Sequence, residues 1–186
     1  VTITRSSARS TYPAQFMLVA AMNPCPCGNY GSRITPCRCT AQQIQRYRNR
    51  ISGPMLDRID IHVEMGEVGY NDIAGRSCGE PSSAIRARVN AARAIQTRRY
   101  AGMGILFNAQ LTNRMMNQYC VLTSDAEALM KKAFAALKLS ARAYTRLLKV
   151  SRTIADLAGS EQIKAEHIAE AIQYRSLESK YWGEIK

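Results

Sequence analysis

The sequence lacks any apolar run near the roughly 18 residues that cross a membrane, and its N-terminus has no signal-peptide core. It is also poor in acidic residues, because 14 Asp and Glu stand against 26 Lys and Arg, a formal net charge of +12. The first two absences predict a cytoplasmic protein without a membrane partner. The shortage of acidic residues predicts an anionic partner, either nucleic acid or the phosphates of a nucleotide.

Two elements of nucleotide chemistry are missing as well. The sequence has no G-x-x-x-x-G-K-[ST] loop to hold phosphates and no acidic strand end to hold magnesium. The composition is nevertheless that of a globular protein, with 46% hydrophobic and 22% charged residues among 186. This length allows one domain, or two small ones, with a buried core.

Four of the six cysteines form two C-x-C pairs, Cys25/Cys27 and Cys37/Cys39, with nine residues between the pairs. In a cytoplasmic protein such pairs are not a disulfide framework, so clustered thiols indicate a metal. Four thiolates complete the tetrahedral shell of a structural zinc ion, and we predict that these four bind zinc. The alternative is a metal-free loop of buried thiols.

Two segments have the pattern of β-strands. The apolar run Phe16–Met22 is typical of a strand buried on both faces, and Ile59–Met65 alternates between apolar and polar residues. Asn23 follows the first segment and Arg58 precedes the second. Ligands bind at strand ends in open α/β sheets, so Asn23 and Arg58 are candidate site residues.

Each of these two residues also has a local interpretation. Asn23 precedes a proline and can simply begin a turn. Arg58 can pair with Asp57 or with Asp60, its close neighbours in sequence. The spacing alone favours these local roles.

Two basic groups are candidates for nucleic-acid contact. Val1–Arg5 alternates and is predicted to be the returning arm of a β-hairpin whose other arm lies upstream, so Arg5 and Arg9 either meet phosphates or form a solvated edge. Thr40 and Gln43 form a capping box that begins a helix. That helix carries a second group, which either binds phosphates and stacks a base or is a solvated face: Arg46, Tyr47, Arg48 and Arg50.

From Ala84 onward the periodicity is helical. The first helix has an apolar stripe, and later helices are predicted to begin at Asn108, at Ser124, at Ser140 and near Ala165. The stripe consists of Ile85, Val89, Ala92 and Ile95. Several short helices of this kind predict a compact bundle.

Arg142 lies in the first turn of the helix that Ser140 begins. Free amides and the positive end of the helix dipole suit a phosphate there, and an arginine adds a bidentate contact. The same position is also compatible with a solvated arginine. Arg146 and Arg152 on this helix are weaker candidates.

Three stretches, LVAAMNPCPCG, ISGPMLDRIDIHVE and SARAYTRLLKVSRTIADLAG, occur in the order found in ComM/YifB-type magnesium-chelatase-like AAA+ ATPases. The chain resembles this family over nearly all of residues 1–175. The resemblance implies that Asn23 is sensor 1, Arg58 the arginine finger and Arg142 the sensor 2 arginine. The absent phosphate loop departs from the family pattern and predicts the C-terminal piece of a longer ATPase.

The resemblance also implies a fold: the α/β remnant of an AAA+ core, with parallel strands, a β-hairpin and the four-cysteine loop, followed by an all-α helical-bundle lid. We predict core residues 1–67, a linker over 68–83, the lid over 84–175 and a tail over 176–186. ATP and magnesium are expected to be bound mostly by the missing half.

The expected function of the parent protein is ATP hydrolysis in a homo-oligomeric, hexameric ring that acts on DNA in recombination or natural transformation. Alone, this fragment is expected to be inactive. Two alternatives remain open. One is a magnesium-chelatase motor subunit with a protein partner, and the other is a non-enzymatic, zinc-stabilised nucleic-acid-binding module.

Overall fold

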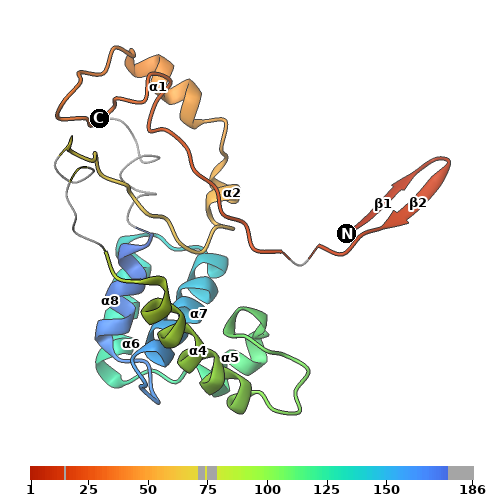
Figure 1. Cartoon of the computed structure of the whole chain (residues 1–186). Coiled ribbons are helices and arrows are strands. Elements are labelled where there is room, and N and C mark those ends of the chain that lie inside the picture. Colours follow the sequence, from red (N-terminus) through yellow and green to blue (C-terminus); the bar gives the residue numbers. More distant parts are fainter. Residues whose placement is uncertain (15, 71–73, 75–78, 176–186) are drawn as a thin grey trace. The chain divides into compact units, whose positions relative to one another are not determined.

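The structure is a computed structural model that describes residues 1–14, 16–70, 74 and 79–175 (Figure 1). Two compact units make up the chain, Val1–Ile44 and a second that begins at Gln45. The elements are β1 (Thr2–Arg5), β2 (Ala8–Thr11), α1 (Ala41–Arg48), α2 (Gly53–Leu56), α4 (Ser82–Arg99), the 3-10 helix η1 (Asn108–Gln110), α5 (Asn113–Tyr119), α6 (Ser124–Ala136), α7 (Ala141–Leu157) and α8 (Ala165–Gln173).

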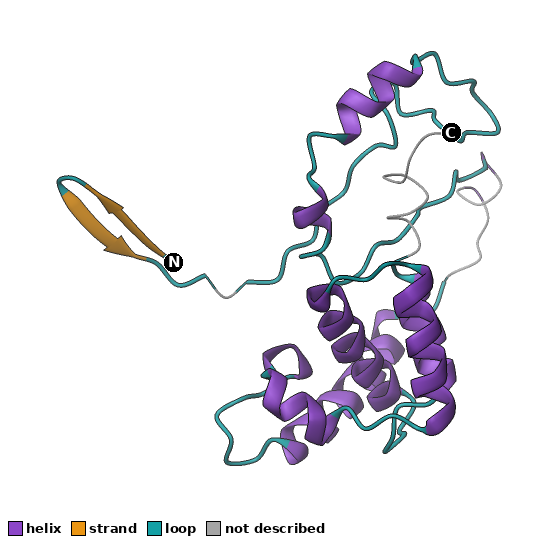
Figure 2. Cartoon of the chain, turned by 180° about the vertical axis from the view of Figure 1, so that it is seen from behind, coloured by secondary structure: helices purple, strands orange, loops and turns teal. Residues whose placement is uncertain are grey.

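The described part of the chain is mostly helical, and its strands form one hairpin (Figure 2). The predicted domain boundaries stay a prediction, and part of the predicted linker and all of the predicted tail lie outside the described residues. Within the described ranges, no helix is both long and apolar enough to cross a membrane.

The hairpin is confirmed, but its predicted direction is wrong. β1 pairs antiparallel with β2, from Thr2 opposite Thr11 to Arg5 opposite Ala8, so the partner strand lies downstream. The physical reason is the short polar turn of two serines, which lets the chain reverse at once. The ladder extends by one more pair, because the Tyr12 N–H donates to the carbonyl of Val1 at 2.8 Å and the Val1 nitrogen donates to the carbonyl of Tyr12 at 2.7 Å.

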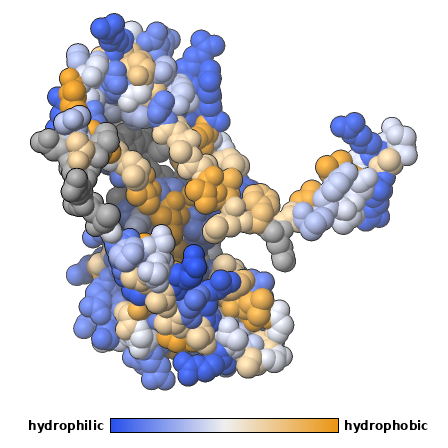
Figure 3. All heavy atoms as spheres, in the orientation of Figure 1, coloured by the Kyte–Doolittle hydropathy of each residue, from blue (hydrophilic) through white to orange (hydrophobic). Residues whose placement is uncertain are grey.

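The prediction of a buried strand over Phe16–Met22 is wrong for this structure. The segment has no strand hydrogen bonds, and the exposed fractions of Phe16, Met17 and Val19 are 77%, 88% and 83%. Apolar colouring marks the segment that follows the hairpin (Figure 3). A strand needs neighbouring strands for its N–H and C=O groups, and the described residues supply none to this segment.

The second predicted strand, Ile59–Met65, is likewise not part of a sheet. Its backbone donates and accepts hydrogen bonds at the end of α8: the His62 N–H donates to the carbonyl of Tyr174 at 2.8 Å, and the Arg175 guanidinium donates to the carbonyl of Ile59 at 3.3 Å. His62 is half-buried, whereas Ile61 and Val63 are exposed, which is the reverse of what the alternation predicts. A parallel sheet is therefore not formed by the described residues.

The second unit has its core among α4, α5, α6, α7 and α8, which lie together in Figure 1. α7 is central, since it packs against α4, α5, α8 and η1, while α6 packs against α8. A parallel β-bridge between Leu122 and Ile163 ties the segment before α6 to the segment before α8. The buried cluster includes Leu111, Met130, Leu147, Ile154, Ile163 and Ile168. The predicted helical bundle is thus present.

Three of the predicted helix starts, at Thr40, Ser140 and Ala165, are confirmed, and the caps predicted at Ser124 and Asn108 are wrong. The Thr40 hydroxyl accepts from the Gln43 N–H at 3.2 Å, and the Ser140 hydroxyl accepts from the Ala143 N–H at 3.1 Å. α6 is capped by Thr123, one residue before the predicted cap, because the Thr123 hydroxyl accepts from an amide of the first turn. Asn108 caps no helix, because its side chain is buried in a polar network described below.

The buried face of α4 also differs from the prediction. Ile85 and Val89 are each 43% exposed, and the packed side consists of Ala92, Gln96 and Tyr100. Gln96 can lie on the buried face of α4 because its side-chain oxygen accepts a hydrogen bond from the backbone N–H of residue 108, at 3.1 Å. A polar residue with a partner can be buried at little cost.

Candidate functional site

The four predicted metal ligands lie together in the first unit. The Sγ atoms of Cys25, Cys27, Cys37 and Cys39 all fall within 4.8 Å of one another. The shortest separations are 3.4 Å between Cys25 and Cys27, 3.5 Å between Cys27 and Cys37, and 3.7 Å between Cys25 and Cys37. The cluster has a closed inner side, because Cys25 is fully buried.

The loop that carries the cluster turns tightly after the first pair. Gly28 has φ of +83° and donates its N–H to the Cys25 carbonyl at 3.1 Å. A residue with a Cβ is strained in this conformation, which explains the glycine. Farther along, the Ser32 hydroxyl accepts from the N–H groups of Ile34 and Thr35, at 3.1 and 2.9 Å, and shapes the approach to the second pair.

Hydrogen bonds from backbone amides favour the thiolate form of Cys27. Hydrogen bonds from the N–H groups of Asn29 and Arg38, followed by one from Cys25, lower the pKa of Cys27 to about 6. Desolvation, together with the neighbouring Cys27 sulfur, raises the pKa of Cys39 to about 12. Four converging sulfurs therefore share protons when no cation neutralises them, and a divalent cation would displace those protons.

The geometry of the cluster fits a tetrahedral thiolate site. Zinc–sulfur bonds of about 2.3 Å in a tetrahedron place the sulfurs about 3.8 Å apart, close to the separations found between these thiols. Four sulfur ligands leave no open position for water or substrate. This cluster can therefore hold a metal ion in a structural role.

Asn23 lies in the same unit, exposed at the end of the apolar segment. Its side-chain amide nitrogen lies 3.8 Å from the point where a Cβ on Gly28 would stand. The structure thus brings Asn23 next to the turn of the cysteine loop. Arg58 and Arg142, the other two predicted nucleotide-site residues, belong to the second unit.

Arg58 follows the short helix α2 and is exposed. Its guanidinium donates to the Pro54 carbonyl at 2.7 Å. The local interpretation, a pair with a neighbouring aspartate, is not what the structure shows: Asp57 bonds Ser140 and Arg175, and Asp60 pairs with Arg146. Within the described residues no carboxylate pairs with Arg58, so most of its donors face solvent.

Arg142 lies where the sequence places it, in the first turn of α7 after the Ser140 cap. Its side chain is exposed, and no described carboxylate pairs with it. Arg146, one turn later, is engaged with Asp60. The start of α7 therefore presents one accessible arginine to an anion.

The candidates for nucleic-acid contact are distributed over two elements. The hairpin register puts Arg5 and Arg9 on opposite faces, because Arg5 stands opposite Ala8 and Arg9 opposite Thr4. Both are exposed. They can therefore meet two different phosphates, but they do not form one patch.

In α1 and the turn after it, the basic residues divide into two classes. Arg46 and Arg50 are exposed, and the Arg50 guanidinium lies over the Tyr47 ring, 6.0 Å from its centre. Arg48 is buried, with 2% of its surface exposed, so its prediction as a surface contact is wrong. Ile44, four residues earlier on the same face of α1, is buried as well, so both side chains lie on the side of the helix that is shielded from solvent.

A buried polar network in the second unit was not expected from sequence reasoning. The Asp156 carboxylate accepts from both terminal nitrogens of Arg99, at 2.9 and 2.5 Å, and from the Nε of Arg152 at 3.1 Å. Asn108 donates to it at 2.8 Å. Arg152 also donates to the Ser160 carbonyl at 2.5 Å, so this arginine has a structural role and is unavailable to a phosphate. The available signal was the spacing of Arg152 and Asp156, four residues apart on one helix.

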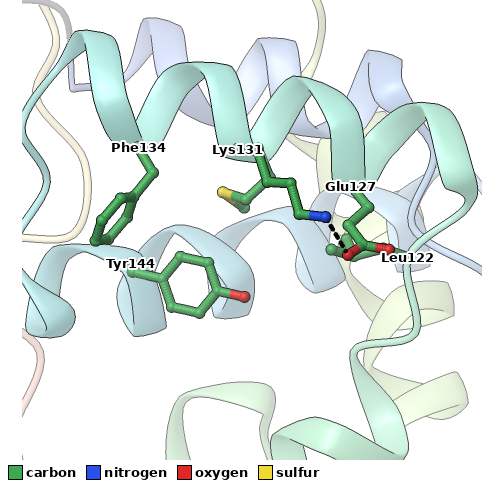
Figure 4. A pocket seen from close by; sticks show the side chains of 6 residues that line it. Leu122, Glu127, Lys131, Phe134 and Tyr144 are labelled. Carbon is green, nitrogen blue, oxygen red and sulfur yellow. Dashed lines mark ion pairs between the residues drawn. The ribbon is translucent and has the colours of Figure 1, made fainter.

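A shallow pocket of about 200 Å³ lies between α6 and α7 (Figure 4). The rings of Phe134 and Tyr144 meet edge to face on one side, with centres 6.0 Å apart. Lys131 and Glu127 form an ion pair of 3.1 Å on the other side. The pocket contains no group of the predicted nucleotide site.

Comparison with known proteins gives the family. A family model described as magnesium chelatase, subunit ChlI C-terminal matches residues 79–175, and one described as magnesium chelatase, subunit ChlI matches residues 1–73. This chain belongs to the magnesium chelatase family. The magnesium chelatase and ComM proteins are AAA+ proteins, so the resemblance inferred from the three motifs is confirmed.

Individual members of the magnesium chelatase family match almost the whole chain. It is 42% identical to the YifB protein of Salmonella typhimurium and 43% identical to competence protein ComM of Haemophilus influenzae, in each case over 95% of its length. A Mycobacterium bovis protein is 32% identical over 94% of the chain. The chain spans 34% of the length of each of these relatives.

Proposed function

We propose that this chain is the C-terminal part of an AAA+ ATPase that couples ATP hydrolysis to DNA remodelling, such as branch migration in recombination or natural transformation. The observation that carries the proposal is Arg58. Its guanidinium is exposed and oriented by a backbone carbonyl, while the two aspartates that could neutralise it are engaged elsewhere. An arginine finger needs such a planar, permanently charged group with free donors.

In this proposal the predicted nucleotide-site residues have separate roles. Arg58 crosses to the site of a neighbouring subunit and stabilises charge on the γ-phosphate. Arg142 contacts the phosphates from the first turn of α7, where the helix dipole also favours an anion. Asn23 orients the attacking water. ATP and magnesium are bound mostly by residues outside this sequence, since the chain has no phosphate loop.

The four-cysteine cluster is proposed to hold a structural zinc ion. The choice of zinc rests on the donor set, because four thiolates in a closed tetrahedral arrangement are the ligands of structural zinc sites. Here the ligands are Cys25, Cys27, Cys37 and Cys39, with the spacing described above. The metal would fix the loop beside Asn23 and take no part in hydrolysis.

DNA is proposed as the partner for two reasons. The formal net charge of +12 favours a polyanion, and one relative carries the name competence protein. The homo-oligomeric, hexameric ring is proposed because a finger that acts in a neighbouring site needs a neighbour. Arg5, Arg9, Arg46, Tyr47 and Arg50 are the exposed or half-buried candidates for DNA contact.

The test uses the full-length protein that contains these residues, assayed for ATP hydrolysis with and without DNA. We expect Arg58→Ala to lower kcat by about 10³-fold or more, as loss of an arginine finger does, while a fluorescent ATP analogue still binds. Arg114→Ala, which removes an exposed arginine from α5, is the matched control and should leave turnover unchanged. Normal turnover in Arg58→Ala would contradict the finger assignment.

A chelatase motor subunit is the second candidate, favoured by the description of the matching family. It has the same ATPase chemistry but a protein partner in place of DNA. Stimulation of the ATPase by DNA supports the DNA-remodelling proposal, and its absence favours the chelatase alternative. A non-enzymatic nucleic-acid module instead requires salt-dependent DNA binding without ATP hydrolysis by the full-length protein.

A further inference from the structure

The turn that carries Arg58 is fastened to the helical bundle by the two aspartates beside Arg58. The Ser140 hydroxyl donates to the Asp57 carboxylate at 3.0 Å, and Arg175 reaches the other oxygen of that carboxylate at 3.3 Å. On the far side of Arg58, Asp60 forms an ion pair with Arg146. Both ends of the turn are therefore held, while the Arg58 guanidinium bonds only the carbonyl of Pro54 among the described residues.

The points of attachment lie on either side of Arg142. Ser140 is the cap of α7, Arg142 lies in its first turn, and Arg146 follows one turn later. The turn therefore contacts α7 just before and just after the position from which Arg142 projects. Any rotation of the α7 N-terminus that moves Arg142 must also move Asp57 and Asp60, or break these contacts.

We propose that Asp57 and Asp60 are positioning residues that fix the Arg58 turn to the start of α7, so that Arg58 and Arg142 move as one rigid element. The inference rests on the proposed function, because it assigns both arginines to nucleotide phosphates. Its consequence is that binding of an anion at Arg142 in one site changes the position of Arg58 in the neighbouring site. A shift of about 1 Å in a catalytic group can cost about a hundredfold in rate.

The Asp60–Arg146 pair is the better one to test. Asp60 is 54% exposed and Arg146 28% exposed, and an ion pair this accessible contributes little to stability. Its loss should leave the fold intact, so a change in turnover reports position. Asp57 is less suitable, because its partner Arg175 is 3% exposed and would be left as a buried charge.

The experiment measures kcat and KM for ATP in the full-length protein. Asp60→Asn and Arg146→Ala should each lower kcat about tenfold to a hundredfold, with KM for ATP changed by less than about threefold. The exchanged pair, Asp60→Arg with Arg146→Asp, should recover kcat to within about threefold of the unmodified protein, because it re-forms the ion pair. Glu127→Gln removes a carboxylate of similar exposure from an ion pair on α6 and is the control.

A second readout does not depend on ATP turnover. Hydrogen exchange should become several-fold faster in Asp60→Asn over residues 53–60 and 140–146, because both segments lose the same contact. Unchanged kcat in Asp60→Asn, or no recovery in the exchanged pair, would overturn the inference in an active protein. If the unmodified protein hydrolyses no ATP, the proposed function fails, and unchanged exchange in these two segments would then overturn the coupling by itself.

Discussion

Replacing Asp156 by asparagine should destabilise the helical unit more than any exposed substitution. The Asp156 side chain is fully buried and holds Arg99 and Arg152 against α7. Asparagine has nearly the same volume, so the change creates no cavity. It removes the negative charge, however, and turns an amide NH₂ toward guanidinium groups that are themselves donors.

The size of the effect follows from the burial of the two arginines. Arg152 is 1% exposed, and its remaining partners are the carbonyls of Ser160 and Glu161. Removing one partner of a buried ion pair costs about 3–5 kcal/mol, because the other charge stays buried without compensation. With a urea m-value of about 2 kcal/mol/M, a loss of about 4 kcal/mol lowers the unfolding midpoint by about 2 M.

Urea unfolding followed by circular dichroism measures this loss, because the helical signal comes mostly from the second unit. Asp125→Asn is the control: this aspartate lies exposed in the first turn of α6, where the helix dipole contributes only about 0.3–1 kcal/mol. If Asp156→Asn and Asp125→Asn shifted the midpoint equally, the buried network would not hold the bundle together. That result would refute the reasoning.

Two further predictions concern protons and metal. Desolvation lowers the pKa of buried His167 despite the nearby carboxylate of Glu166, so the unfolded chain binds the proton below about pH 6.5 and stability should fall as pH drops from 7 to 5. The free energy of unfolding should fall by at most about 1.4 kcal/mol per pH unit from this group. Unfolding curves measured at several pH values should show this dependence in the unmodified protein and not in His167→Gln, and an equal pH dependence in both proteins would contradict the assignment. Elemental analysis should find about one zinc per chain, released together with the four cluster thiols. Gly28→Ala should weaken the binding of zinc, because the φ of +83° at this position strains a residue with a Cβ. A purified protein that contains no metal and whose four thiols react freely would contradict the zinc site.

Local signals in the sequence predicted the helices well. Caps such as Thr40 and Ser140 act within three residues, so the sequence alone contains the whole interaction. The buried face of α4 was missed because Gln96 gains a partner from a segment 12 residues away, which periodicity cannot register. The strand predicted over Phe16–Met22 was wrong for a related reason. An apolar segment forms a β-strand only where a neighbouring strand pairs with its backbone N–H and C=O groups.

In the candidate site, too, features that depend on nearby residues were predictable and features that depend on distant residues were not. The spacing of the two C-x-C pairs was enough to predict that four sulfurs converge. The environment of Arg58 was not predictable, because Asp57 and Asp60 sit beside it in sequence yet bond to residues more than 80 positions away. A basic residue in the sequence is also not always available to bind an anion, because Arg48 and Arg152 are both buried in the fold.

The exposed apolar segment Phe16–Met22 has a consequence for the colloidal behaviour of the chain. Seven uncharged residues of this kind match the length and composition of segments that stack into intermolecular β-structure. The net charge of +12 opposes such contacts by electrostatic repulsion, whose range falls from about 30 Å at 0.01 M salt to about 8 Å at 0.15 M. The chain should therefore stay dispersed in dilute buffer and self-associate as salt is raised, the opposite of a protein held together by ion pairs.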